Sequence, residues 1–265
     1  MKHFRIRLGK QAVAVSLAML CFSTCVGGTS AAAGNDAKVW VDGCPVIGEF
    51  VSDPEIEALI AEKEAALEKA GNQTRVASKN LAIPQEPQET NYWCGYAAIQ
   101  SLLAFENILH SQTVIAAAVY STGSACPWYL TNGNSTSQFP AAVYLTNEIS
   151  GFSYVPFPYG AAGANPPSAS DLKSRITGTI NSTHGVLACG TSKASSGNAS
   201  HLPDYPNSNI GHWIVVKGYY NYGDNMYIAD PAKSSAVSWS GNIQAYYSVL
   251  TTKLQAFVAP KGIIW

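Results

Sequence analysis

The chain has 265 residues, of which 47% are hydrophobic and only 12% are charged, and its formal net charge is −1. This length is enough for one large domain or two small ones with a buried core, and the hydrophobic fraction excludes wholesale disorder. The near-zero net charge gives no basic surface for nucleic acid, so we expect no nucleic-acid partner.

Residues 1–33 have the pattern of a secretory signal peptide. Basic residues come first, an apolar run covers residues 12–22, and small residues lead to Ala33. This order predicts export with cleavage near Ala33, and hence a secreted bacterial protein. The apolar run is short for a membrane span, so we expect no stable membrane insertion. Four of the 16 basic residues and none of the 17 acidic residues lie in this segment, which leaves a formal charge of −5 on the remainder.

Residues 34–83 form an N-terminal segment with one amphipathic helix. Asp53 suits the N-cap and Pro54 the first helical position, and apolar residues recur at helical spacing until Gly71 ends the pattern. We expect this helix to dock on the rest of the chain. The sequence leaves open whether it is an ordinary packed helix or part of a removable pro-region.

The next part of the chain has few charges and a helical pattern. Helices are predicted over 94–109, 113–120, 139–149 and 170–181, with loops over 121–137 and 156–167.

After residue 184 the pattern changes to strands. A buried strand is predicted over 185–189, a polar loop over 191–209, a strong strand over 212–216, and its hairpin partner over 226–229. We expect a last strand over 254–258. Helices followed by an antiparallel sheet predict an α+β fold rather than a doubly wound one.

Four residues could together carry nucleophilic chemistry. Cys94 begins a predicted helix, whose N-terminus would stabilise a thiolate. His212 begins the strongest strand and could act as the base, while Asp230 ends the partner strand, close enough to orient the histidine ring. Gln88 precedes the cysteine by six positions and could donate to an oxyanion, with the Cys94 backbone N–H as second donor.

Each residue also has an ordinary structural explanation. Cys94 could be half of a disulfide, His212 a core histidine at a strand edge, and Asp230 a turn residue before Pro231. Gln88 alone indicates nothing. The functional interpretation depends on the four residue types occurring together and in this order.

The ordered combination of Gln88, Cys94-Gly95, Gly211-His212-Trp213 and Asp230-Pro231 resembles the papain-fold cysteine peptidases. Within them it is most similar to exported bacterial proteins related to bacteriocin-leader peptidases, cysteine peptidase family 39. The resemblance covers about residues 84–235, although Tyr96 stands where many relatives have proline.

This resemblance implies a two-lobed papain-like catalytic domain over residues 84–265. Its helical lobe would carry Cys94 as the nucleophile. Its sheet lobe would carry His212 as general base and acid, with Asp230 orienting the ring and Gln88 as oxyanion donor. The implied activity is that of a secreted cysteine peptidase, which hydrolyses an amide bond of a peptide or protein substrate through an acyl-enzyme.

Two other classes of function remain open. The same triad could serve an acyltransferase or a cell-wall amidase, and the low charge and many aromatic residues would suit cell-wall material as a partner. Alternatively, the chain could be a non-catalytic binding protein that keeps the papain fold. The sequence shows no metal-ligand spacing and no glycine-rich phosphate loop, so we expect no metal and no cofactor.

The cysteines distinguish these classes. Cys44, Cys94, Cys126 and Cys189 remain after export, and an oxidising compartment favours disulfides. If Cys94 pairs with another cysteine, no thiolate exists. If Cys94 is free, we expect a Cys126–Cys189 bridge with Cys44 left over. Cys44, in a pro-segment, could then cap Cys94 until the segment is removed.

Overall fold

A computed structural model describes residues 41–70, 76–131, 137–160 and 165–265, and these belong to a single structural unit. The predicted signal peptide lies outside the described residues. The helices are α1 (Pro54–Ala70), α2 (Cys94–Phe105), α3 (Gln112–Val119), α4 (Pro140–Glu148), α5 (Ala169–Asn181) and α6 (Thr251–Val258).

The helices predicted before residue 182 are all present. Asp53 caps α1, because its carboxylate accepts a hydrogen bond from the Glu55 N–H at 3.0 Å. Helix α2 ends four residues before the predicted Leu109, since Asn107 has left-handed backbone angles with φ of 62°. The strand predicted over 254–258 is wrong. This stretch is helix α6, and its buried residues have the three- and four-residue spacing of a helix face.

The main sheet has the strand order β10-β9-β8-β7-β11-β6, and β1 and β3 both pair with β8. Its strands are β1 (Val41–Asp42), β3 (Lys79–Asn80), β6 (Pro156–Phe157), β7 (Val186–Ser192), β8 (Ile210–Tyr220), β9 (Asn225–Ala229), β10 (Tyr246–Leu250) and β11 (Gly262–Ile264). A second, small sheet has the order β2-β4-β5, formed by β2 (Val46–Ile47), β4 (Tyr129–Thr131) and β5 (Ser137–Gln138). All pairs are antiparallel except β1–β8 and β2–β4.

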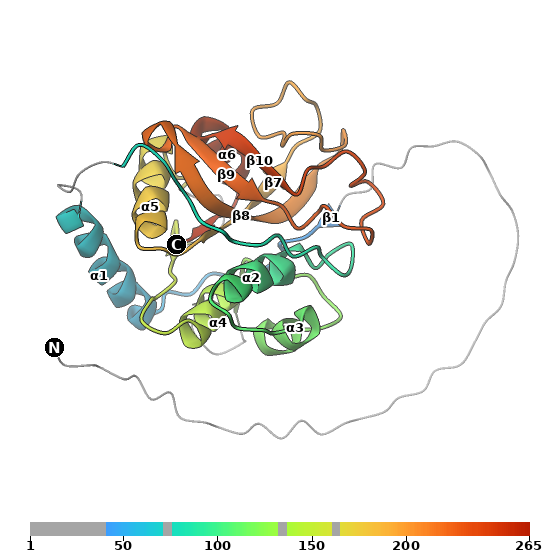
Figure 1. The fold of residues 1–265 in the computed structure, drawn as a ribbon. Helices are drawn as coiled ribbons and strands as arrows, with labels where there is room; N and C mark the ends of the chain where they lie inside the picture. Colours follow the sequence, from blue (N-terminus) through green and yellow to red (C-terminus); the bar gives the residue numbers. More distant parts are fainter. Residues whose placement is uncertain (1–40, 71–75, 132–136, 161–164) are drawn as a thin grey trace, which may run out of the picture. The chain divides into compact units, whose positions relative to one another are not determined.

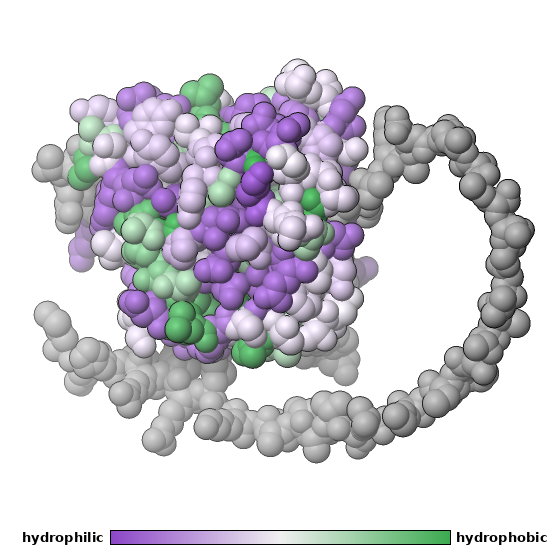
Figure 2. Space-filling model, turned by 45° about the vertical axis from the view of Figure 1, so that its right-hand side comes forward, coloured by the Kyte–Doolittle hydropathy of each residue, from purple (hydrophilic) through white to green (hydrophobic). Residues whose placement is uncertain are grey.

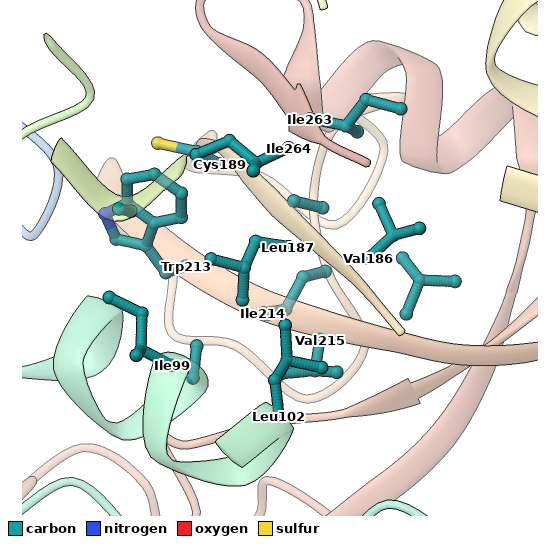
Figure 3. Close-up of a cluster of buried hydrophobic side chains, with 14 of the residues drawn as sticks. Ile99, Leu102, Val186, Leu187, Cys189, Trp213, Ile214, Val215, Ile263 and Ile264 are labelled. Atoms are coloured by element: carbon teal, nitrogen blue, oxygen red, sulfur yellow. The ribbon is translucent and has the colours of Figure 1, made fainter. Parts of the chain in front are cut away.

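Helices pack against the mostly antiparallel sheet in two groups, α2–α4 and α5–α6, which confirms the α+β fold class. Helices α2, α3 and α4 pack together on one side, and α2 lies against β8 (Figure 1). Between α2 and the sheet, Ile99 and Leu102 lie beside Leu187 of β7 and Val215 of β8, all buried (Figure 3). This packing holds the start of α2 next to the start of β8.

The surface agrees with the low charge and polar composition. On the face shown in Figure 2, hydrophilic residues predominate and hydrophobic residues form only small patches. None of the helices that the structure describes is long and apolar enough to cross a membrane.

Candidate active site

The thiol of Cys94 lies at the N-terminus of α2. Cys94 is the first residue of the helix, and the N-cap residue Trp93 makes no capping hydrogen bond with its side chain. The free backbone N–H groups and the helix dipole therefore favour negative charge at this position. The residue is only 2% exposed.

His212 lies close to the start of β8 and is held by a carboxylate. Its Nε2 is 2.8 Å from Oδ1 of Asp230, and both side chains are buried. The Cys94 thiol lies close enough to the His212 ring to raise the pKa of the ring. Because Nε2 faces the carboxylate, Nδ1 is the ring nitrogen available to the sulfur. The structure thus brings these three predicted residues together.

The environment of His212 favours its protonated form. Burial by itself lowers the pKa of the ring, but the charges of Cys94 and Asp230 and the hydrogen bonds with both raise it to about 10. An imidazolium beside the sulfur is the state in which a cysteine nucleophile is activated.

Asp230 reaches His212 along the strands rather than directly across them. Ala229 pairs with Val215, and a bulge interrupts the β8–β9 ladder between Val216 and Gly218. The simple hairpin geometry predicts that residues 212 and 230 lie directly opposite each other. The observed register shows that they do not. The carboxylate still meets the ring because it extends beyond the end of β9.

Two tyrosines that the sequence did not indicate complete the carboxylate site. The hydroxyls of Tyr205 and Tyr247 donate to Oδ2 of Asp230 at 2.8 Å and 2.7 Å, and the Ala232 N–H donates to Oδ1 at 2.9 Å. Burial by itself raises the pKa of Asp230, but the charge of His212 and the hydrogen bonds with His212, the Ala232 N–H and Tyr247 lower it below its usual range. Asp230 is therefore an ionised, fully hydrogen-bonded carboxylate.

The same two tyrosines remain neutral donors. Burial, followed by the charge of Asp230, raises the pKa of both Tyr205 and Tyr247 well above 10. Tyr205 lies in the predicted polar loop shortly before β8, and Tyr247 lies on β10. No local pattern marks them, because only the fold brings them to Asp230.

Gln88 is buried beside the loop that follows Asp230. Its N–H donates to the carbonyl of Pro231 at 3.0 Å, and the Ser234 hydroxyl donates to its carbonyl at 2.5 Å. Its side-chain Nε2 donates to the carbonyl of Thr90 at 2.6 Å, while Oε1 is buried without a partner among the described residues. One of the two amide hydrogens is therefore engaged within its own loop, and the second is available.

The predicted Cys126–Cys189 bridge is wrong, and so is a Cys44–Cys94 disulfide. All four cysteines that the structure describes are free and buried. The Cys44 thiol instead donates to the carbonyl of Gly190 at 3.5 Å. Burial, followed by the charges of neighbouring cysteines, raises the pKa of Cys126 well above its usual value. The cysteines other than Cys94 behave as small core residues.

Within the described ranges, no group of three or more His, Cys, Asp or Glu residues could hold a metal ion.

A thiol at a helix N-terminus, with an imidazole and a buried carboxylate behind it, is the arrangement of a thiol hydrolase. The model of the Peptidase C39-like family matches residues 80–252, and the chain belongs to this family. The chain is therefore a cysteine peptidase by family, and the resemblance seen in the sequence is confirmed.

Two solved structures are similar to the chain at low identity. One is a double glycine motif protease from an AMS/PCAT transporter in complex with the leader peptide. It is 16% identical, with a TM-score of 0.39, and the match covers 70% of this chain and 90% of that chain. The other is xylellain, a cysteine protease from Xylella fastidiosa, which is 14% identical with a TM-score of 0.38, covering 84% and 95%. A search of the curated proteins finds no match.

Proposed function

We propose that the protein hydrolyses peptide bonds with Cys94 as nucleophile, His212 as general acid and base, and Asp230 as the residue that orients the ring. The observation that carries this proposal is the buried His212–Asp230 pair, which lies beside the thiol at the start of α2. A structural cysteine or histidine would not require both an ionised carboxylate and a helix N-terminus at the same place.

The reaction follows from these positions. The Cys94 sulfur attacks the substrate carbonyl carbon, and the imidazolium of His212 gives its proton to the departing amine as the carbon–nitrogen bond breaks. Water then attacks the thioester, with His212 taking its proton, and the carboxylic acid leaves. Asp230 stabilises the imidazolium and fixes the ring so that Nδ1 faces the sulfur.

The oxyanion that forms in each step needs donors. The Cys94 backbone N–H at the start of α2 is one candidate, and the free amide hydrogen of Gln88 is the second. Gln88 is supported by its burial and by its backbone attachment to the loop after Asp230.

The test is hydrolysis of fluorescein-labelled casein under reducing conditions. Cys94→Ala and His212→Ala are expected to lower kcat/KM by about 10⁴-fold or more, because removing either member of such a pair abolishes the nucleophilic route. His110→Gln is the matched control, since His110 is partly exposed and bonds Tyr144 outside the site. Unchanged hydrolysis in Cys94→Ala would overturn the proposal.

We also propose that the enzyme is exported, on the basis of the charge and hydropathy order of residues 1–33. Expression of the full chain in a bacterial host should give a form outside the cytoplasm that begins close to residue 34. A protein retained in the cytoplasm with its original N-terminus would argue against export.

A further inference from the structure

Strand β1 lies beside the candidate active site. Strand β1 pairs in parallel with the start of β8, with Asp42 opposite Gly211, and Figure 1 shows the two strands side by side. The Gly43 N–H donates to the carbonyl of Gly211 at 2.9 Å. Gly211 is the residue directly before His212, so this hydrogen bond fixes Gly43 next to the imidazole.

The carbonyl of Gly43 faces the thiol. Its oxygen lies 3.4 Å from Sγ of Cys94, although 51 residues separate the two in sequence. Gly43 and Cys44 are buried, and they lie where they contribute to the near-complete burial of Cys94. The Gly43–Cys44 peptide bond therefore lies against the nucleophile, whose thiol donates to the Gly43 oxygen, and attack requires the carbonyl to turn so that its carbon faces the sulfur.

Only glycine fits at position 43. A Cβ added there would lie 2.6 Å from Sγ of Cys94 and 2.5 Å from the carbonyl oxygen of Gly211, distances that real Cβ atoms do not reach. Gly211 also lies close to this segment, because a Cβ added there would lie 2.7 Å from Oδ1 of Asp42. The facing glycines allow the segment to approach the thiol closely.

The residues that follow the Gly43–Cys44 bond are also held in place by backbone pairing. The Trp128 N–H donates to the carbonyl of Pro45 at 2.8 Å, and β2 continues as a parallel partner of β4. The Cys44 N–H donates to Oδ1 of Asp42 at 3.1 Å. Backbone pairing on both sides of one peptide bond is how an extended peptide binds across a peptidase site.

We propose that residues 41–47, here called the cleft segment, are an internal substrate, and that Cys94 cleaves the Gly43–Cys44 bond of its own chain. This inference rests on the proposed function. The Cys94 sulfur bonds to the carbonyl carbon of Gly43, the carbon–nitrogen bond breaks, and the proton of His212 passes to the nitrogen of Cys44. Water then hydrolyses the thioester, which releases a piece ending at Gly43 and leaves a chain that begins at Cys44.

Intact-mass measurement of the chain from residue 34 onward, incubated under reducing conditions, tests the proposal. The wild type is expected to convert to a chain beginning at Cys44, and Cys94→Ala to stay uncut. The cut fraction should not depend on protein concentration, because both partners belong to one molecule.

Two glycine variants test the geometry. Gly43→Ala is expected to abolish self-cleavage, since its Cβ meets both Cys94 and the Gly211 carbonyl. Gly241→Ala makes the same chemical change where nothing lies within 4 Å of the new Cβ, and it should cut itself like the wild type. If Gly43→Ala cuts itself after residue 43 as fast as Gly241→Ala, the inference is wrong.

A separate readout distinguishes this inference from the proposed function. A peptide with the sequence of residues 38–48 is added to each protein. If the wild type cleaves the added peptide while its own chain stays intact, self-cleavage is refuted and the peptidase proposal stands. If the wild type cleaves neither this peptide, nor casein, nor itself, both are refuted. Cleavage of the Cys94→Ala chain at the same bond would also overturn the inference.

Discussion

The charge state of His212 is decided by two side chains. Burial disfavours the imidazolium, yet Cys94 and Asp230 outweigh it and place the pKa near 10. The carboxylate can do this because hydrogen bonds from Tyr205, Tyr247 and the Ala232 N–H stabilise its charged form. The two tyrosines thus act on the thiol indirectly, through the carboxylate and the ring.

Removal of the carboxylate charge should be visible in the pH profile. In Asp230→Asn the pKa of His212 falls, because the amide keeps the shape of the side chain but not its charge. We expect the alkaline limb of kcat/KM, where the imidazolium is lost, to move to lower pH by about 1–3 units. Tyr247→Phe is the control, since it removes one hydrogen bond and leaves the charge. Superimposable alkaline limbs for wild type and Asp230→Asn would contradict this account.

The raised pKa of His212 should also make the free energy of unfolding depend on pH. The pKa of His212 is about 10 in the folded chain, above the ordinary value of about 6.5 in an unfolded one. The imidazolium therefore contributes stability that is fully present below about pH 6.5 and is lost as the pH rises to about 10. We expect urea unfolding to show a steeper loss of stability over this range for the wild type than for His212→Gln. Parallel pH dependences would show that His212 does not carry the shift.

At the scale of elements, the sequence predicts the helices and strands that are encoded by patterns of nearby residues. The helices before residue 182 and the β8–β9 hairpin follow from periodicity, capping and a short connection. Strands β4, β5 and β6 have two or three residues each and fall in predicted loops, because such short strands carry no period of their own.

The residues of the candidate site likewise include some that the sequence predicts and others that only the folded chain reveals. Cys94, His212 and Asp230 could be predicted, since each stands at the end of a recognisable element. Tyr247 and Gly43 could not, because a sheet partner and a distant segment bring them to the site only in the folded chain.

Helix α1 is attached to the enzyme through α5. Arg175 of α5 donates from Nε and Nη2 to Oε1 of Glu64 at 2.9 Å and 2.6 Å, and its guanidinium stacks on the ring of Phe157. A lysine cannot reproduce this planar two-nitrogen contact.

We expect Arg175→Lys to loosen α1 by about 1 kcal/mol, so that amide hydrogen exchange over 54–70 becomes faster. Casein hydrolysis should not change, because α1 does not form part of the Cys94–His212–Asp230 site. Lys173→Gln is the matched control on the same helix, since Lys173 pairs with Asp224 instead of α1. Equal exchange in both variants would show that Arg175 does not hold α1.

At the scale of the whole molecule, the cleft segment and the free cysteines make one further prediction. Cys94 is the predicted nucleophile, yet it is 2% exposed while Gly43 lies against it. A reactive thiol that is covered should alkylate slowly, whatever its intrinsic reactivity. We therefore compare the rate at which iodoacetamide labels Cys94 in the intact wild-type chain, before it cuts itself, with the rate in a chain made to begin at Cys44, which lacks the residue that covers the sulfur.

Labelling is followed by mass spectrometry under reducing conditions, so that all four described cysteines are thiols. We expect Cys94 in the chain that begins at Cys44 to react at least about tenfold faster than Cys94 in an intact chain that keeps residues 34–43, because only the shorter chain leaves the sulfur open to solvent. Cys126 is the internal control: it is fully buried in the core, burial raises its pKa well above the usual value, and it should stay unlabelled in both proteins. Equal rates at Cys94 would mean that Gly43 does not cover the thiol in solution. Fast labelling of Cys126 would instead mean that the shortened chain has lost its core packing. As a control, Gly241→Ala adds a methyl group in open space, so a shortened chain with this substitution should label no faster than the shortened chain without it.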